Sequence, residues 1–208
     1  MKKQFALLIA GLFAGSILAF STSAHAVDTT GTVDYTDGGI TFDPQVPGNA
    51  SASLPQSLNF GSHAIQTKAD ETWVATSDGD QESPVTTGQV AISDNRGNSS
   101  TGWTVKVNEP TQFAANSNPL TGAALSFTVG TLTNNVNAAP TGTRIANGAK
   151  TTMLVNQSVS VLTAQPNEGA GETALPITKF ELNVPKDTAK QQAQYQTTLV
   201  WTFSATPS

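Results

Sequence analysis

Few side chains in the sequence could carry nucleophilic or metal-dependent chemistry. The chain contains two histidines, His25 and His63, and no cysteine. Any Ser/His/Asp triad outside the first residues would have to use His63, which follows residues 60–62 with no nucleophile-elbow motif. A zinc site needs several nitrogen or thiolate ligands, and this composition does not supply them. We therefore expect His63 to occupy a surface turn, and we expect neither an enzyme nor a metal ion or other cofactor.

Residues 78–82 are the other place where chemistry could occur. Asp78, Asp80 and Glu82 alternate there with Gly79 and Gln81, a pattern that partly resembles a calcium-binding loop. The further spaced ligands and the flanking helices of an EF-hand are missing. We favour a solvated acidic loop, with a divalent cation as the alternative. Glycoside hydrolysis would need two carboxylates about 5–9.5 Å apart in a cleft, and no catalytic pattern in the sequence supports that chemistry.

The first residues predict export from the cell. Lys2 and Lys3 precede an apolar run over residues 5–20, and Ala24-His25-Ala26 offers small residues where a signal peptidase cleaves. We expect residues 1–26 to be a secretory signal peptide, with an uncleaved anchor as the less favoured alternative. No later apolar stretch is long enough to span a membrane, no cysteine could carry a lipid, and no C-terminal sorting motif is followed by an apolar tail. We therefore expect no covalent or transmembrane tether.

The charge of the exported part limits its partners. Residues 27–208 keep all 15 acidic residues but only 8 of the 10 basic ones, so their formal net charge is −7. Binding to nucleic acid requires clustered cations that neutralise phosphates. Binding to an anionic lipid surface requires the same. Neither nucleic acid nor a membrane is therefore an expected partner. We also expect that high salt releases little of the protein from the partner that it does bind.

The pattern of apolar residues predicts strands. Thr, Ser, Asn, Gly, Ala and Val dominate the composition, which suits strands and turns better than helices. Alternation with a period of two recurs in short runs at residues 58–60, 90–92, 103–107, 125–129, 159–161, 180–184 and 199–203. We predict a single all-β domain, an antiparallel β-sandwich of the Ig-like or Greek-key type, over residues 57–208. Residues 27–56 would form an extended N-terminal segment with one edge strand near Ile40 and Phe42, and residues 187–193 are a weak helix candidate.

Two stretches of the sequence resemble the WxL-domain surface proteins of low-GC Gram-positive bacteria. The proximal stretch reads Asp94-x-Arg96-Gly97 and then Gly102-Trp103-Thr104-Val105, with Val105 where the family usually has Leu. The distal stretch reads Tyr195-x-x-x-Leu199-x-Trp201-x-Phe203-x-x-x-Pro207, with Phe203 in place of the usual Leu. Residues 57–61 and 182–185 also fit the family layout, so the resemblance covers roughly residues 57–208.

The resemblance implies a secreted cell-surface protein that attaches non-covalently to peptidoglycan in the cell wall. It also implies co-secreted surface proteins as possible members of a complex with this chain. The candidate residues for contact with the wall or with such a partner are Trp103, Tyr195, Leu199, Trp201, Phe203, Asp94 and Arg96.

The distal stretch has a physical meaning of its own. Within a strand, Tyr195, Thr197, Leu199, Trp201 and Phe203 would share one face because they are two residues apart. A tryptophan on such a face can anchor the core, with its indole N–H bonded to a backbone carbonyl, or it can stack on the apolar face of an N-acetyl sugar. We favour the core for Trp103 and Trp201, since their neighbours alternate. For Trp73 both interpretations stay open.

Asp94 and Arg96 also allow two interpretations. They could contact a wall component or a partner protein, or Arg96 could hold the loop to a carboxylate and to carbonyls while Gly97 adopts a positive φ. Because Asn and Gly residues surround the pair, as they do in turns, we favour the structural interpretation.

Three functions from different classes follow from the sequence. The first is a peptidoglycan-binding surface protein, and the second is a structural subunit that binds a partner protein by adding a strand at a sheet edge. The third, a hydrolase acting on the wall, is the least favoured.

Overall fold

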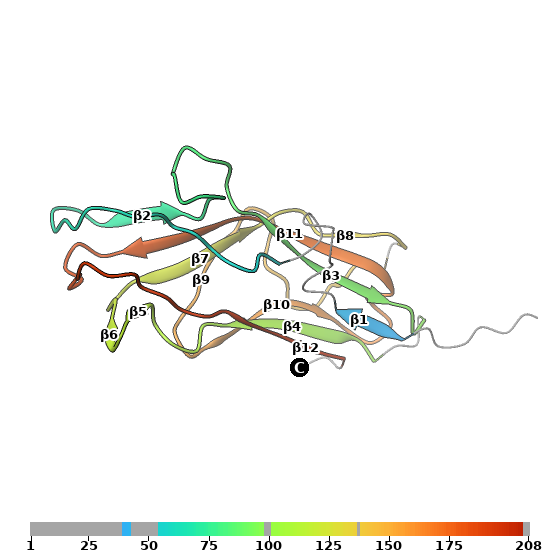
Figure 1. Cartoon of the computed structure of the whole chain (residues 1–208). Coiled ribbons are helices and arrows are strands. Elements are labelled where there is room, and N and C mark those ends of the chain that lie inside the picture. The colour runs from blue at the N-terminus through green and yellow to red at the C-terminus, as the bar shows by residue number, and fades with distance from the viewer. Residues whose placement is uncertain (1–38, 43–53, 98–100, 137, 206–208) are drawn as a thin grey trace, which may run out of the picture. The chain divides into compact units, whose positions relative to one another are not determined.

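The computed structural model describes residues 39–42, 54–97, 101–136 and 138–205, and these residues form strands, turns and loops (Figure 1). The predicted signal peptide, residues 1–26, lies outside the described residues, as do residues 27–38 and 43–53 of the predicted N-terminal segment. The expected edge strand near Ile40 and Phe42 is present as β1 (Ile40–Phe42), which pairs with β3 (Gly88–Asp94). Residues 40–42 therefore belong to a sheet of the predicted β domain.

The strands form one large and one small antiparallel sheet. The large sheet has the order β1, β3, β11 (Gly171–Val184), β7 (Ala124–Val129) and β9 (Lys150–Thr152), and β2 (Glu71–Val74) and β8 (Thr133–Asn134) also pair with β11. The small sheet has the order β10 (Ser158–Ala164), β4 (Trp103–Asn108) and β12 (Val200–Ser204). A short hairpin joins β5 (Ala114–Ala115) to β6 (Asn118–Pro119).

Strand β11 organises the large sheet because its length lets it serve four neighbours. Its first half pairs with β3 on one edge and with β8 on the other, and its second half pairs with β2 and β7. The predicted run at residues 180–184 is the second half of this 14-residue strand. Long-range backbone pairing of this kind brings segments together that are more than 100 residues apart in sequence.

One apolar core fills the space between the two sheets. It contains Trp103 and Val105 from the small sheet together with Phe127 and Phe180 from the large sheet. The rings of Phe127 and Trp201 lie across the core from one another, with centroids 6.3 Å apart. The prediction of an all-β antiparallel sandwich is confirmed. Among the described residues there is no helix with the length and hydropathy to cross a membrane.

Two local predictions are wrong. The weak helix candidate at residues 187–193 is a turn followed by an irregular segment, in which the Thr188 amide donates to the Pro185 carbonyl at 3.0 Å. Lys190 in that segment forms an ion pair with Glu71, so a tertiary contact takes the place of a helical turn. The predicted strand at residues 58–60 makes only a single bridge, between Asn59 and Thr76.

Trp103 is the largest fully buried side chain. Its indole ring lies against Gly169, where an added Cβ would come within 2.6 Å of Nε1 and within 2.8 Å of the Cβ of Ala164. The expected hydrogen bond from the indole N–H to a carbonyl is absent, because Nε1 has no partner in the described part of the chain. Gly169 also has a φ of +72°, so both its backbone conformation and its missing side chain serve the packing of Trp103.

Replacing Gly169 by Ala should destabilise the fold through both effects. A positive φ costs a residue with a side chain about 1–2 kcal/mol, and overpacking against the indole should add about 1–3 kcal/mol. Gly148 is a matched control, since its φ is +74° and nothing lies within 4 Å of an added Cβ. Chemical denaturation of Gly169→Ala and Gly148→Ala should show the larger loss for Gly169→Ala. Equal losses would mean that Trp103 packs without needing the glycine.

Candidate functional site

The distal stretch forms the alternating face that its sequence predicts. Tyr195, Leu199, Trp201 and Phe203 are half-buried and pack against the core, whereas the residues between them are exposed apart from the half-buried Thr197, which continues the same face. Only β12, from Val200 onward, is a regular strand. Before it, a pair of backbone hydrogen bonds between residues 114 and 196 fixes the chain, at 2.9 and 3.0 Å. The prediction of one shared face is therefore confirmed, although the strand is shorter than expected.

A groove with a volume of about 1740 Å³ lies beside this face. Residues 54–65 and residues 190–199 line it, and we call these segments its first and second walls. The groove reaches down to buried apolar side chains of the core, which are Leu120, Leu125, Phe180, Leu182 and Val184. Amide and hydroxyl side chains stand on the second wall, and they are Gln191, Gln192, Gln194, Gln196, Thr197 and Thr198. The arrangement combines an apolar floor with a rim of mainly uncharged polar groups.

Three of the predicted contact residues line this groove, and the others do not. Tyr195, Leu199 and Trp201 are among the lining residues. Phe203 instead stacks on Phe42, with ring centroids 5.5 Å apart and an interplanar angle of 17°, and so ties β12 to β1. The structure thus separates a groove-facing part of the distal stretch from a part that joins the two sheets.

The three tryptophans have different roles. Trp103 is 0% exposed, so its ring belongs to the core and offers no surface to a ligand. Trp201 packs one part of its ring against Phe127 and turns the remainder toward the groove. Trp73 is half-buried at the other wall, where the ring of His63 stacks on it at 3.4 Å with an interplanar angle of 5°. Trp73 therefore both packs and remains partly accessible.

Sequence reasoning missed the pairing of His63 with Trp73. His63 is exposed, as expected for a turn, and its Nε2 lies 2.7 Å from the carbonyl oxygen of Phe60. The turn is tight because Gly61 and Gly79 approach so closely that an added Cβ on Gly61 would lie 2.2 Å from the Gly79 oxygen. Ten residues separate the two rings in sequence, and no local pattern indicates their contact.

The acidic loop is built from its own hydrogen bonds. The carboxylate of Asp78 accepts bonds from the Asp80 amide at 3.0 Å and from the Ser83 hydroxyl at 2.9 Å. The bond from the Asp80 amide is the main reason why the pKa of Asp78 lies below its usual value. In the part of the chain that the structure describes, no three His, Cys, Asp or Glu side chains gather to hold a metal ion.

The charged side chains that line the groove are tied to other groups. Glu71 and Lys190 form an ion pair at 3.0 Å, with side chains that are 10% and 9% exposed. The Lys190 ammonium also donates to the carbonyl of Gln66 at 3.0 Å. Asp78 is held in its loop as described above. The charges of Glu71 and Lys190 therefore compensate one another, whereas the exposed Asp78 keeps a negative charge beside the groove.

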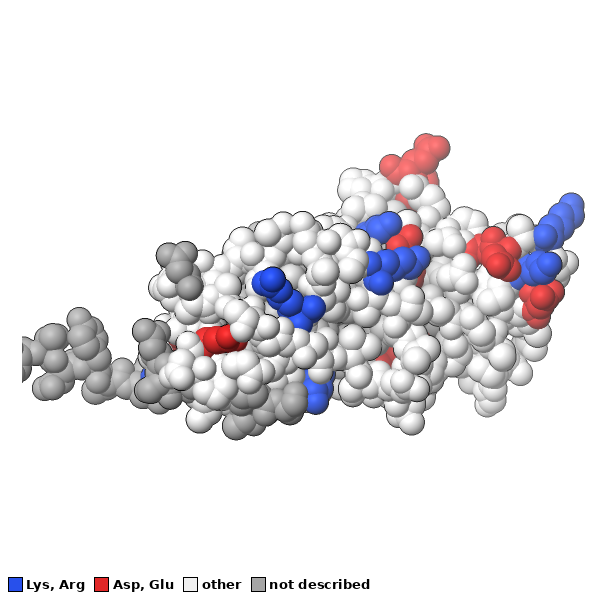
Figure 2. Space-filling model, turned by 180° about the vertical axis from the view of Figure 1, so that it is seen from behind, with Lys and Arg blue, Asp and Glu red and all other residues white. Residues whose placement is uncertain are grey.

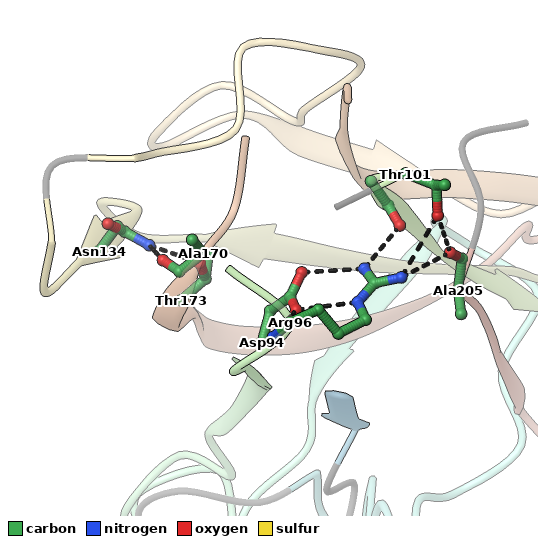
Figure 3. Close-up of polar contacts among 8 residues, drawn as sticks. Asp94, Arg96, Thr101, Asn134, Ala170, Thr173 and Ala205 are labelled. Carbon is green, nitrogen blue, oxygen red and sulfur yellow. Dashed lines mark hydrogen bonds and ion pairs between the residues drawn. The ribbon is translucent and has the colours of Figure 1, made fainter. Parts of the chain in front are cut away.

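The side chains of Asp94 and Arg96 pair at the end of the small sheet where β12 stops (Figure 3). We call this pair and its hydrogen bonds the latch. Nε and Nη2 of Arg96 each donate to one oxygen of the fully buried Asp94 carboxylate at 2.9 Å. The remaining donors reach the carbonyl of Gly102, the hydroxyl of Thr101 and the carbonyl of Ala205. A guanidinium has five N–H donors, and all five are used here. Arg96 therefore joins the loop after β3 to the chain just beyond β12.

The latch has the features expected if Arg96 serves to hold the loop in place, which is the structural interpretation. Gly97 adopts a φ of +86°, as that interpretation requires. The Arg96 side chain is only 15% exposed, so little of it remains for a wall component. Pro207, the last residue of the distal stretch, lies outside the described residues.

Glu109 is a buried acid next to the distal stretch. It is 1% exposed, Thr197 is a hydrogen-bond partner of its carboxylate, and Oε1 has no partner among the residues the structure describes. Burial raises the pKa of Glu109 above its usual value, and the hydrogen bond with Thr197 offsets only part of that rise. Ionised Glu109 is therefore a source of instability beneath the groove wall.

Glu109→Gln should stabilise the protein at pH 7 and alter its response to pH. Because the pKa of Glu109 is higher in the folded chain than in the unfolded chain, the folded state binds more protons, and stability falls as the pH rises above the ordinary value of 4.5. The Gln variant keeps the shape of the side chain without this ionisation. Denaturation at several pH values should show a gain for the variant that is present at pH 7 and shrinks toward pH 4.5. A gain that does not change with pH would contradict the assignment.

Arg96→Lys should weaken the latch because an ammonium has three donors and lacks the planar fork that fits Asp94. We expect a loss of about 1–3 kcal/mol, with Asp94 left partly unpaired in a buried site. Arg144, the other arginine, is exposed, and Arg144→Lys should change the stability by less than about 0.5 kcal/mol. Urea denaturation of the two variants measures the difference. Similar stabilities for both would show that the latch adds nothing to the fold.

Comparison with known proteins agrees with this architecture. The family model described as "WxL domain surface cell wall-binding" matches residues 22–207. No curated protein matches the chain. The matched region begins before the predicted domain boundary at residue 57 and includes β1, which pairs within the large sheet. Because the match spans nearly the whole sequence, the chain belongs to the WxL family of surface, cell wall-binding domains.

Proposed function

We propose that this protein is secreted and attaches non-covalently to peptidoglycan through the groove beside its distal stretch, without a catalytic step. One observation carries the proposal: the groove-facing side chains Tyr195, Leu199 and Trp201 belong to the stretch that resembles the family's distal motif. They are half-buried, so the fold holds them in place while part of each remains available to a ligand. Family membership supports a wall partner.

The charge of the protein supports contacts other than ion pairs. Residues 27–208 carry a formal charge of −7, which opposes attraction to anionic wall polymers. On the face shown in Figure 2, acidic and basic side chains are sparse and interspersed, and most of the surface is uncharged. Stacking and hydrogen bonding in the groove depend little on ionic strength.

A second candidate function rests on the outer edge of β12 along Val200–Phe203. The outer edge of β10 is covered by residues 143–145, through backbone bonds of 3.3 and 2.7 Å. Along Val200–Phe203, by contrast, β4 is the one strand partner among the described residues. A partner protein could add a strand there and so hold this chain at the wall indirectly.

Trp201→Ala should lower wall binding by about tenfold or more while leaving a folded protein. Because Trp201 is half-buried, its removal should cost about 2 kcal/mol, less than the removal of a fully buried tryptophan. Thr202→Ala is the matched control, since Thr202 is exposed on the opposite side of the same strand. The measurement is sedimentation of each purified protein with sacculi stripped of anionic polymers, beside its melting curve.

The same assay at low and high salt separates the alternatives. The proposal expects the wild-type protein to sediment at both salt concentrations without any other protein present. Release by high salt would favour ion pairing, and sedimentation only after a co-secreted protein is added would favour strand addition at β12. Release of soluble sugars or peptides from the sacculi would show a catalytic activity.

A further inference from the structure

We propose that the groove binds the glycan strand of peptidoglycan over several sugar units and does not bind the peptide stems. This inference rests on the proposed attachment to peptidoglycan and names the part of the polymer that is recognised. It follows from the charge, the polar groups, the rings and the size of the groove.

Charge is the first argument. Stem peptides carry free carboxylates and amino groups, and a charge moved into a partly buried site needs a counter-charge there. Lys190 is the one Lys or Arg among the described lining residues, and it is already paired with Glu71 at 3.0 Å. The carboxylates of a stem would have to break that ion pair or enter unpaired, and the exposed Asp78, whose partners in its loop are neutral donors, would repel them. The sugar rings, with the lactyl carboxyl groups joined to the stems as amides, carry no charge.

The polar groups of the groove suit sugars. Hydroxyl and acetamide groups donate and accept hydrogen bonds, and so do the Gln and Thr side chains on the second wall. Gln192 is exposed and can turn either end of its amide to a ligand. Facing this wall, Asn59 adds another amide to the lining. Amide side chains on both walls can therefore follow a chain of neutral polar groups.

The rings provide apolar contact at both walls. Trp201 and Tyr195 line the groove from the distal stretch, and Trp73 lines it from β2. Tyr195 is held in place because its hydroxyl accepts a hydrogen bond from the backbone N–H of Gln191 at 2.8 Å. The ring of His63 stacks on one face of the Trp73 ring, so a ligand cannot stack on that face. Rings on two walls favour a ligand that presents apolar faces repeatedly along its length.

Size is the last argument. Pockets for single small molecules enclose about 300–1,000 Å³. The groove, with a volume of about 1740 Å³, exceeds that range. A single sugar would leave most of it empty, whereas an oligosaccharide would contact both the Trp201 region and the Trp73 region.

The test uses defined probes with the full exported chain. β-1,4-linked N-acetylglucosamine oligomers of increasing length, peptide-free glycan strands whose lactyl carboxyl groups are capped as amides, and isolated stem peptides are titrated by calorimetry. We expect the oligomers to bind more tightly as they lengthen, by about tenfold from two units to six, and the stem peptides not to bind. Binding of stems with no binding of glycan would overturn the inference.

Two variants of opposite charge at Gln192 provide an independent test of whether the bound ligand is charged. Gln192→Lys and Gln192→Glu place opposite charges on the rim, at an exposed position with little effect on stability. For an uncharged glycan, both variants should bind within about twofold of one another at low salt. A charged stem would instead bind the two variants with opposite changes in affinity that disappear at high salt, and that outcome contradicts the inference.

The outcomes for the inference and for the proposed function are distinct. Sedimentation with sacculi but not with peptide-free glycan would overturn only the glycan assignment. Failure to sediment with sacculi in the absence of another protein would overturn the proposed function itself, and the groove would then take a protein segment. Binding to both sacculi and glycan strands, lost together in Trp201→Ala, supports both.

Discussion

The pairing of β12 with β4 is the interaction on which the candidate site depends. Five residues of β12 pair with β4 in register, from Val200 opposite Asn108 to Ser204 opposite Thr104. Strand β4 is in turn fixed in the core by Trp103 and by its pairing with β10. Because side chains alternate along a strand, this register turns Trp201 inward and leaves Thr202 in solvent. A slip of one residue would exchange the two faces and remove the groove-facing ring.

Side chains of the sheets provide the floor of the candidate site. Buried side chains of β7 and β11 close the groove from below, and the segments before β2 and after β11 form its walls. The polar groups of the walls are mainly amides and hydroxyls. Such groups can recognise a ligand by its shape and its hydrogen bonds, as the proposed binding function requires.

The sequence allowed the strands and the shared face of the distal stretch to be predicted because both depend on local periodicity. The runs at residues 90–92, 103–107 and 125–129 alternate strongly, and each became a strand. The groove could not be predicted, since its walls come from residues 54–65 and 190–199, which meet only through the fold. The same holds for the contact of His63 with Trp73 and for the ion pair of Glu71 with Lys190. Residues 187–193 look helical locally, but tertiary contacts of Lys190 outweigh that preference.

The position of Arg96 has a mechanical consequence. A protein held at a surface experiences pulling forces, and an edge strand fails most easily when its hydrogen bonds break one after another from an end. The guanidinium of Arg96 donates a hydrogen bond to the carbonyl of Ala205, immediately after β12, and forms an ion pair with the buried Asp94 carboxylate. Peeling β12 away from that end must first rupture a charge-assisted bond whose donor is held in place by a buried carboxylate. The small sheet is thereby reinforced at the margin where unzipping would otherwise begin.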